Sequence, residues 1–179
     1  ELENLKALFR GFDQAMTPEA IRRFLIPMDD SSRLPWEALL HIQSVPGLID
    51  RLAGTHYGVP LRNALPAYQH SGSLFPIEIA LDIRYYRDLA AAVDALGGAD
   101  FEDARRIFGT RLDMLNILWA YRHRVYYRLS AEEIVNYTLW KTFRTDTTLI
   151  REIALGAPPD EILERLWGRG AVDLSLLEQ

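Results

Sequence analysis

Residue types that can do chemistry occur throughout this chain, but their spacing forms no known catalytic or metal-binding arrangement. The four histidines include no pair at helical metal-binding spacing, and His-Glu-x-x-His is absent. No serine stands on a strained turn with a histidine and an acid in reach. Cysteine is absent, and neither Gly-x-Gly-x-x-Gly nor Gly-Lys-Ser/Thr occurs. We therefore predict no catalytic residue, no cofactor and no metal site.

One basic and aromatic run, residues 121–128, could bind a partner. It contains Arg122, Arg124 and Arg128, and the last two stand four residues apart, which places them on one helix face. Such a face could meet an acidic protein surface, or it could bind phosphates with stacked bases. The chain as a whole carries 20 basic and 25 acidic residues and a net charge of −5, which opposes nucleic-acid binding. We predict a protein partner at these three arginines and no nucleic acid.

A second set of polar residues is notable because it occurs twice. Its members are Glu1, Asn4 and Arg10, and then Asp113, Asn116 and Arg122. A polar group in an apolar helix costs stability unless it is paired. The set therefore predicts a hydrogen-bonded latch that fixes how helices cross. The alternative is a polar rim around a cavity that receives a partner.

The elements that position these residues are predicted to be helices, and the fold class is all-α. Apolar residues recur at three- and four-residue steps, and no stretch of five or more residues alternates strictly. We expect loops at Pro27–Arg33 and Thr55–Ser73, and a Ser130–Glu133 capping box. No apolar stretch approaches the length needed to cross a bilayer. The predicted helices are Leu2–Phe12, Thr17–Leu25, Leu34–Gln43, Pro46–Ala53, one from Pro76 to about Leu96, one from Asp100 to near Gly109, one from Thr110 to Tyr127, one after Ser130, Thr145–Leu155 and Pro159–Trp167.

The repeated polar set belongs to a longer internal repeat of about 110 residues. Three blocks recur in the same order at offsets of 112, 113 and 114: Glu1–Arg10 with Asp113–Arg122, Thr17–Ile21 with Ser130–Ile134, and Leu48–Gly54 with Ile162–Gly168. We predict a partial helical repeat over residues 1–73, which lacks its first helices, and a complete repeat over residues 74–179. Since the first residue is glutamate, we also expect the chain to be part of a longer protein.

At these blocks the sequence resembles the C subunit of A/V-type ATPases, the counterpart of the d subunit in eukaryotic V-type ATPases. The resemblance covers roughly Glu1 to Trp167, and its strongest segment runs from Leu112 to Ile134, together with Glu1–Arg10 and Phe75–Tyr86. It implies a funnel-like, all-helical protein of three related segments, of which this chain would hold about 1.6.

The resemblance also implies a function. It predicts a non-catalytic adaptor on the cytoplasmic side of the membrane, between the rotor shaft and the proteolipid ring, that transmits torque for ion transport. A generic helical scaffold or protein-interaction module unrelated to ATPases would show the same repeat with other partners. A small helical enzyme or ligand-binding domain, or a nucleic-acid module, would need a pocket or a basic surface that the sequence does not specify.

Overall fold

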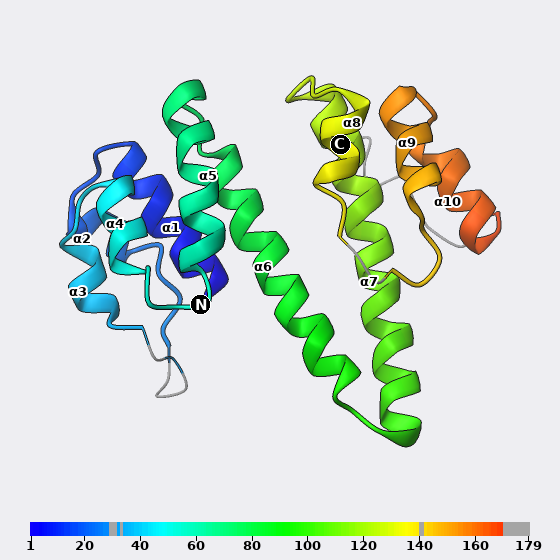
Figure 1. The fold of residues 1–179 in the computed structure, drawn as a ribbon, viewed down its shortest axis with the longest axis horizontal. Helices are drawn as coiled ribbons and strands as arrows, with labels where there is room; N and C mark the ends of the chain where they lie inside the picture. The colour runs from blue at the N-terminus through cyan, green and yellow to red at the C-terminus, as the bar shows by residue number, and fades with distance from the viewer. Residues whose placement is uncertain (29–31, 33, 140–141, 170–179) are drawn as a thin grey trace. The chain divides into compact units, whose positions relative to one another are not determined.

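The computed structural model describes residues 1–28, 32, 34–139 and 142–169, and within these ranges the chain forms ten helices and no strand (Figure 1). The predicted all-α class is confirmed. The chain divides into two compact units, residues 1–86 and 87–179, with the boundary inside α6. The helices are α1 Leu2–Asp13, α2 Pro18–Arg22, α3 Trp36–Leu40, α4 Val45–Arg51, α5 Gly58–Ser71, α6 Phe75–Asp94, α7 Gly98–Val125, α8 Ala131–Asn136, α9 Thr147–Leu155 and α10 Pro159–Trp167.

The first unit packs short helices around α1. The side chains of Thr17 and Ser44 accept hydrogen bonds from the N–H groups of Ala20 and Gly47, so each caps the helix that follows it. The apolar face of α1 then meets α2 and α4, and α5 packs against α4. The buried core of this unit consists of Leu5, Leu8, Phe9, Phe12, Ile21, Leu39, Leu40, Val45, Leu48, Ile49, Leu52, Tyr57, Leu61, Ile77 and Leu81. Since the last two belong to α6, the start of that helix is part of this core.

The prediction of a loop over Thr55–Ser73 was wrong, because α5 occupies most of that range. Pro60 stands in the first turn, where a backbone N–H has no helical acceptor and proline is tolerated. Pro66 lies inside the helix and removes one backbone hydrogen bond. From sequence alone, such a proline indicates the end of a helix. Burial of Leu61 against the core of the first unit offsets that loss.

The second unit is built on the C-terminal half of α7, with α8, α9 and α10 packed beside it. The predicted capping box at Ser130 and Glu133 is confirmed, since each residue's side chain bonds the other's backbone N–H. Asp146 caps α9, and α10 begins at Pro159 as expected. The buried core of this unit consists of Ile117, Ala120, Ile134, Leu149, Ile150, Ile153, Ile162 and Leu163.

The prediction of two helices divided near Gly109 was also wrong, because α7 runs unbroken from Gly98 to Val125. Its N-cap is Gly97, and Asp100, where the predicted helix began, lies in the first turn. Gly109 does not end a helix. A Cβ at this position would lie 2.8 Å from Phe143 Cβ, so glycine is required for the close approach of the 143–145 segment.

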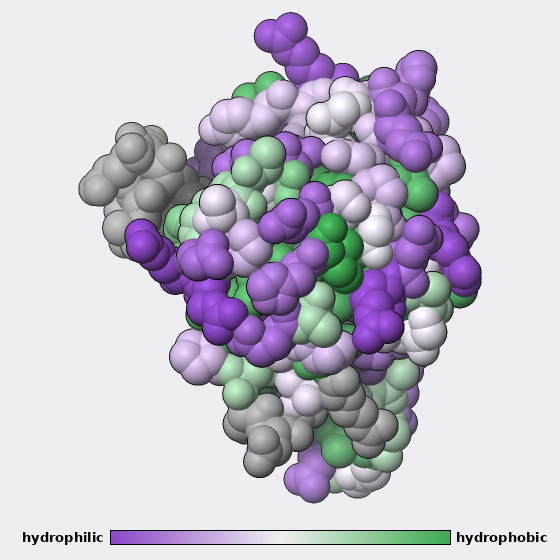
Figure 2. Space-filling view, turned by 90° about the vertical axis from the view of Figure 1, so that its left-hand side faces the viewer, coloured by the Kyte–Doolittle hydropathy of each residue, from purple (hydrophilic) through white to green (hydrophobic). Residues whose placement is uncertain are grey.

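The surface of the first unit, which faces the viewer in Figure 2, is mostly hydrophilic with separate apolar areas. Its exposed large apolar residues among those described are Phe24, Ile26, Val59 and Tyr85. The predicted loop Pro27–Arg33 lies partly outside the described residues. In the described part of the chain, no helix is long and apolar enough to span a membrane.

Candidate functional site

Asn4 and Asn116 make the same pair of hydrogen bonds to a backbone segment in their respective units. Asn4 accepts from the N–H of Ile26 and donates to its carbonyl, both at 2.8 Å. Asn116 accepts from the N–H of Leu139 at 2.7 Å and donates to its carbonyl at 3.0 Å. The acceptor segments lie 22 and 23 residues after the asparagine. We call these two interactions the amide pairings.

The acidic residue three positions before each asparagine also bonds a corresponding hydroxyl group. The Oγ of Ser32 donates to Glu1 at 2.8 Å, and the Oγ1 of Thr145 donates to Asp113 at 2.7 Å. Asp113 is fully buried and additionally accepts the backbone N–H groups of Phe143, Arg144 and Thr145 at 2.9 to 3.1 Å. Its carboxylate therefore holds three consecutive backbone donors of the loop before α9, which satisfies a charge that burial alone would penalise.

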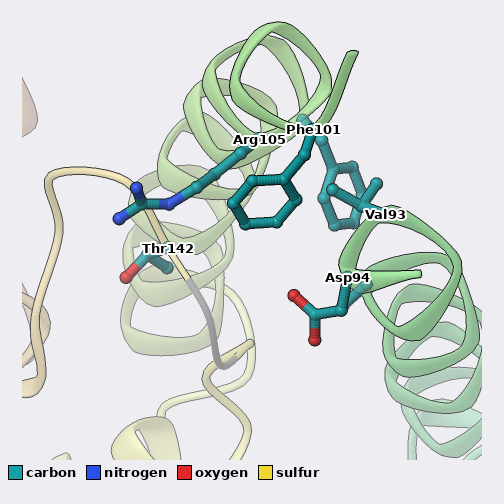
Figure 3. Close-up of a pocket in the computed structure, with 7 residues that line it drawn as sticks. Val93, Asp94, Phe101, Arg105 and Thr142 are labelled. Atoms are coloured by element: carbon teal, nitrogen blue, oxygen red, sulfur yellow. The ribbon is translucent and has the colours of Figure 1, made fainter. Parts of the chain in front are cut away.

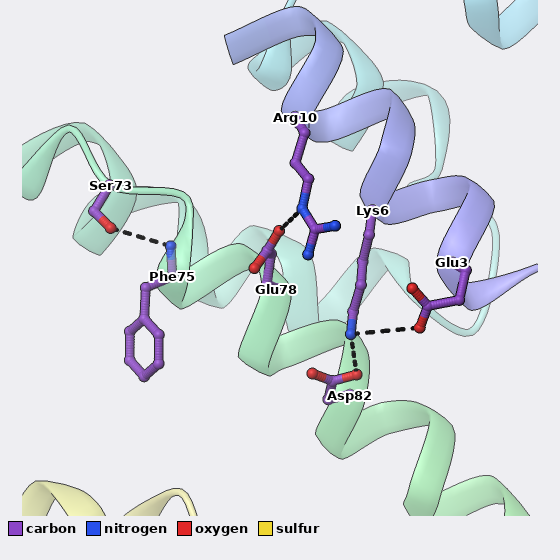
Figure 4. A network of polar contacts seen from close by, with 7 residues as sticks. All are labelled: Glu3, Lys6, Arg10, Ser73, Phe75, Glu78 and Asp82. Atoms are coloured by element: carbon purple, nitrogen blue, oxygen red, sulfur yellow. Dashed lines mark hydrogen bonds and ion pairs between the residues drawn. The ribbon is translucent and has the colours of Figure 1, made fainter. Parts of the chain in front are cut away.

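Arg10, the third member of the first polar set, points toward α6 (Figure 4) and takes no part in the pairing of Asn4 with Ile26. Its Nε lies 2.5 Å from Glu78 Oε1, and one turn away Lys6 Nζ lies 2.6 Å from Asp82 Oδ1. The Lys6 and Asp82 side chains are only 12% and 14% exposed. Burial raises the pKa of Asp82, while the Lys6 ammonium acts in the opposite direction, so this carboxylate depends on its cation. The contribution of Lys6 and of α6 was missed from sequence.

The three arginines predicted to bind a partner have different surroundings. Arg124 donates to the carbonyl of Ile153 at 2.6 Å in the last turn of α9, and its guanidinium lies 5.5 Å from the Tyr121 ring centroid. Arg122 and Arg128 are exposed and make no hydrogen bond or ion pair with any residue that the structure describes. Arg128 has a φ of 53° just after α7 ends. Two of the three side chains are therefore available to a partner, and Arg124 stabilises α9.

Between Arg122 and Arg124, the His123 side chain is buried in an aromatic setting. Its ring centroid lies 6.0 Å from those of Tyr127 and Tyr137, and 6.3 Å from that of Trp119. Burial, with a smaller contribution from the positive charge of Arg122, lowers the pKa of His123 to about 4. The imidazole is therefore neutral at pH 7, and its role is in packing.

The ends of α6 and α7 that adjoin their connecting turn form a small open hollow of about 220 Å³ in the second unit (Figure 3). Its walls are Ala90, Val93, Asp94, Phe101, Arg105, Phe108 and Thr142. None of the residues predicted from sequence lines it. In the described ranges, no three His, Asp or Glu side chains are grouped so that they could hold a metal ion.

Comparison with known proteins identifies the relatives of this chain. Residues 1–176 match the family model described as ATP synthase (C/AC39) subunit. The chain belongs to this family. The resemblance predicted from sequence is thus confirmed at the level of the family. No solved structure matched the chain.

Three curated family members, each named as the C subunit of an A-type ATP synthase, give the extent of the similarity. The protein of Halobacterium salinarum is 32% identical over 101 residues, which cover 56% of this chain and 29% of the relative. That of Methanosphaera stadtmanae is 29% identical over 121 residues, or 65% and 30%. That of Methanocaldococcus jannaschii is 23% identical over 168 residues, or 94% and 42%. The chain thus spans less than half the length of these family members.

Proposed function

We propose that this chain acts as a non-catalytic adaptor in the central stalk of a rotary A/V-type ATPase. It would lie at the cytoplasmic face of the membrane, link the rotor shaft to the proteolipid ring and transmit torque for ion transport. The observation that carries the proposal is the family match over residues 1–176. The matched relatives are named as subunits of an ATP synthase, and an adaptor is the role that needs no reactive site in this chain.

We further propose that residues 1–73 and 74–179 are a partial and a complete copy of one helical unit. The two amide pairings support this, because both asparagines bond a backbone segment at nearly the same sequence distance. The paired hydroxyl bonds of Glu1 and Asp113 support it as well. In this view the polar set is a latch that holds the loop after each central helix. A body stiffened in this way suits a part that transmits force through contacts.

Co-purification tests the proposed partners. The complete gene product, tagged and expressed with the shaft and ring proteins of its own ATPase, should retain both through washing at physiological salt. An Arg122→Glu, Arg128→Glu variant should retain less of one partner, while a Glu102→Arg, Arg105→Glu control should retain both, since it exchanges the charges of an exposed ion pair elsewhere. If neither partner is retained by the unaltered protein, the adaptor role is wrong and a scaffold outside the ATPase takes its place.

A further inference from the structure

The exposed face of α7 around Leu118 and Arg122 corresponds to a face of α1 that is covered by a helix. The amide pairings align Asn4 with Asn116, so the same offset of 112 aligns Lys6 with Leu118 and Arg10 with Arg122. On α1, Lys6 and Arg10 are the two residues that bind α6. On α7, Leu118 is 41% exposed and Arg122 is exposed. Within the described residues of the second unit, no helix covers the equivalent position Leu118.

The contact of α6 with α1 defines how a helix would lie on that surface. Moving from Lys6 to Arg10 advances one turn along α1, while their partners, Asp82 and Glu78, step back one turn along α6. The two helices are therefore antiparallel where they meet, as Figure 4 shows. Ile77 and Leu81, each adjacent to one of the acidic residues, are fully buried in the same core. The covering helix thus supplies apolar residues to the core and carboxylates to its edge.

We infer that the Leu118–Arg122 face of α7 binds an antiparallel amphipathic helix that lies outside residues 1–179. The helix carries a carboxylate opposite Arg122 and, four residues later, an apolar side chain opposite Leu118. Charge complementarity supports the first position, because Arg122 makes no ion pair with a described residue. The second position is supported by Leu118, an apolar residue that stands where α1 has Lys6.

The same chemistry disfavours α6 of a second copy as the occupant. In that arrangement Glu78 would meet Arg122, but Asp82 would lie against Leu118 without its lysine. A carboxylate buried against an apolar side chain is costly when unpaired. Burial already raises the pKa of Asp82 with Lys6 present. The surface therefore distinguishes its occupant from α6 by one residue. The inference does not need the adaptor role, but it rests on the proposed correspondence of the two units.

Labelled peptides of residues 75–94 test the inference by fluorescence anisotropy with the 179-residue chain. The Asp82→Leu peptide should bind about tenfold more tightly than the unaltered sequence, since it removes the unpaired carboxylate. Arg122→Glu in the chain should weaken binding of the Asp82→Leu peptide about fivefold. A peptide that carries both Asp82→Leu and Glu78→Lys should bind the Arg122→Glu chain with the lost affinity restored, because the charges at this contact are then exchanged. The matched control is Arg106→Glu, which lies about 160° around α7 from Arg122 and should leave binding unchanged.

Each other outcome overturns the inference. If the unaltered peptide binds as tightly as the Asp82→Leu peptide, the face does not select an apolar residue, and a second copy becomes the better occupant. If Arg122→Glu acts no differently from Arg106→Glu, or if no peptide binds, the face is not a helix-binding surface. Circular dichroism melting of both variants should show that the chain remains folded, because both arginines are exposed.

Discussion

At the scale of single residues, the two asparagines show how strongly one side chain can specify a local structure. Each amide satisfies both the backbone N–H and the carbonyl of one residue, as a neighbouring β-strand would do in a sheet. The environments differ, however. Leu139 is 3% exposed, whereas Ile26 is 57% exposed. Water can therefore replace the amide of Asn4 more easily than that of Asn116.

This difference predicts unequal costs for the same substitution. Asn116→Ala leaves the N–H and carbonyl of Leu139 buried without partners and should destabilise the second unit by about 2–3 kcal/mol. Asn4→Ala should cost the first unit about 1 kcal/mol, because the Ile26 backbone becomes hydrated. Urea denaturation, with amide hydrogen exchange to separate the two units, measures both values. An equal or larger loss for Asn4→Ala would show that burial of the acceptor segment does not set the cost.

A second prediction concerns pH and His123. Its pKa is about 4 in the folded chain, against an ordinary value near 6.5, so the unfolded state takes up a proton first as pH falls. The folded state should therefore lose stability between pH 6.5 and 4, by at most about 3 kcal/mol from this group, and the full contribution should be present above pH 6.5. The loss over this window should be smaller in His123→Phe. A His123 NMR signal that titrates near pH 6.5 would contradict the buried, neutral imidazole.

Arg122 provides a control for that titration. Its positive charge contributes to the lowered pKa of His123, second to burial. Replacing it by glutamine should raise the pKa of His123 slightly and leave it below its ordinary value. NMR titration of the histidine signals in Arg122→Gln measures the change. A fall in the pKa would mean that the guanidinium does not repel the imidazolium.

At the scale of the helices, sequence reasoning succeeded where a residue acts on its own neighbours. Ser130 and Glu133 form their capping box within one turn, and Pro159 starts α10, so both boundaries are local properties. It failed where distant contacts decide. Pro66 and Gly109 are typical of helix ends, yet both lie inside helices, because the core contact of Leu61 and the approach of Phe143 are formed only in the folded unit.

The site residues follow the same division. The repeat identified Asn4, Asn116, Glu1 and Asp113 as a polar set, because the acid and the amide recur at constant spacing. Their partners could not be named from sequence, since these are mainly backbone groups, which carry no sequence signal. The separation of 22 to 32 residues between each polar residue and its partner becomes known only from the hydrogen bonds of the folded chain.

Gly109 gives a prediction at this scale. Alanine is favoured over glycine inside a helix by about 1 kcal/mol, so helix propensity alone predicts that Gly109→Ala stabilises α7. The structure predicts the reverse, because the new Cβ would lie 2.8 Å from Phe143 Cβ and 3.3 Å from its backbone N. We expect a net loss of about 1–3 kcal/mol, measured by chemical denaturation. A gain in stability would mean that the 143–145 segment moves away from α7 without cost.

At the scale of the whole molecule, the proposed function depends on contacts between proteins and not on a reactive group. The family and the all-α fold were predictable, because the matched blocks lie in helices whose residues recur. Partner surfaces were less predictable, since Arg124 bonds the Ile153 carbonyl while Arg122 and Arg128 stay exposed. Sequence alone could not distinguish an arginine that holds a neighbouring helix from one left for a partner.

Ion transport by reconstituted complexes is the decisive test of torque transmission by this protein. Vesicles that contain the complete ATPase of the source organism should build an ion gradient when ATP is added. Vesicles assembled without the complete gene product of this chain should still hydrolyse ATP on their catalytic subunits and build no gradient, and adding the protein back should restore transport. A gradient that forms without the protein would contradict torque transmission through it. If ATP hydrolysis by the catalytic subunits is lost when only this protein is withheld, its non-catalytic role is contradicted.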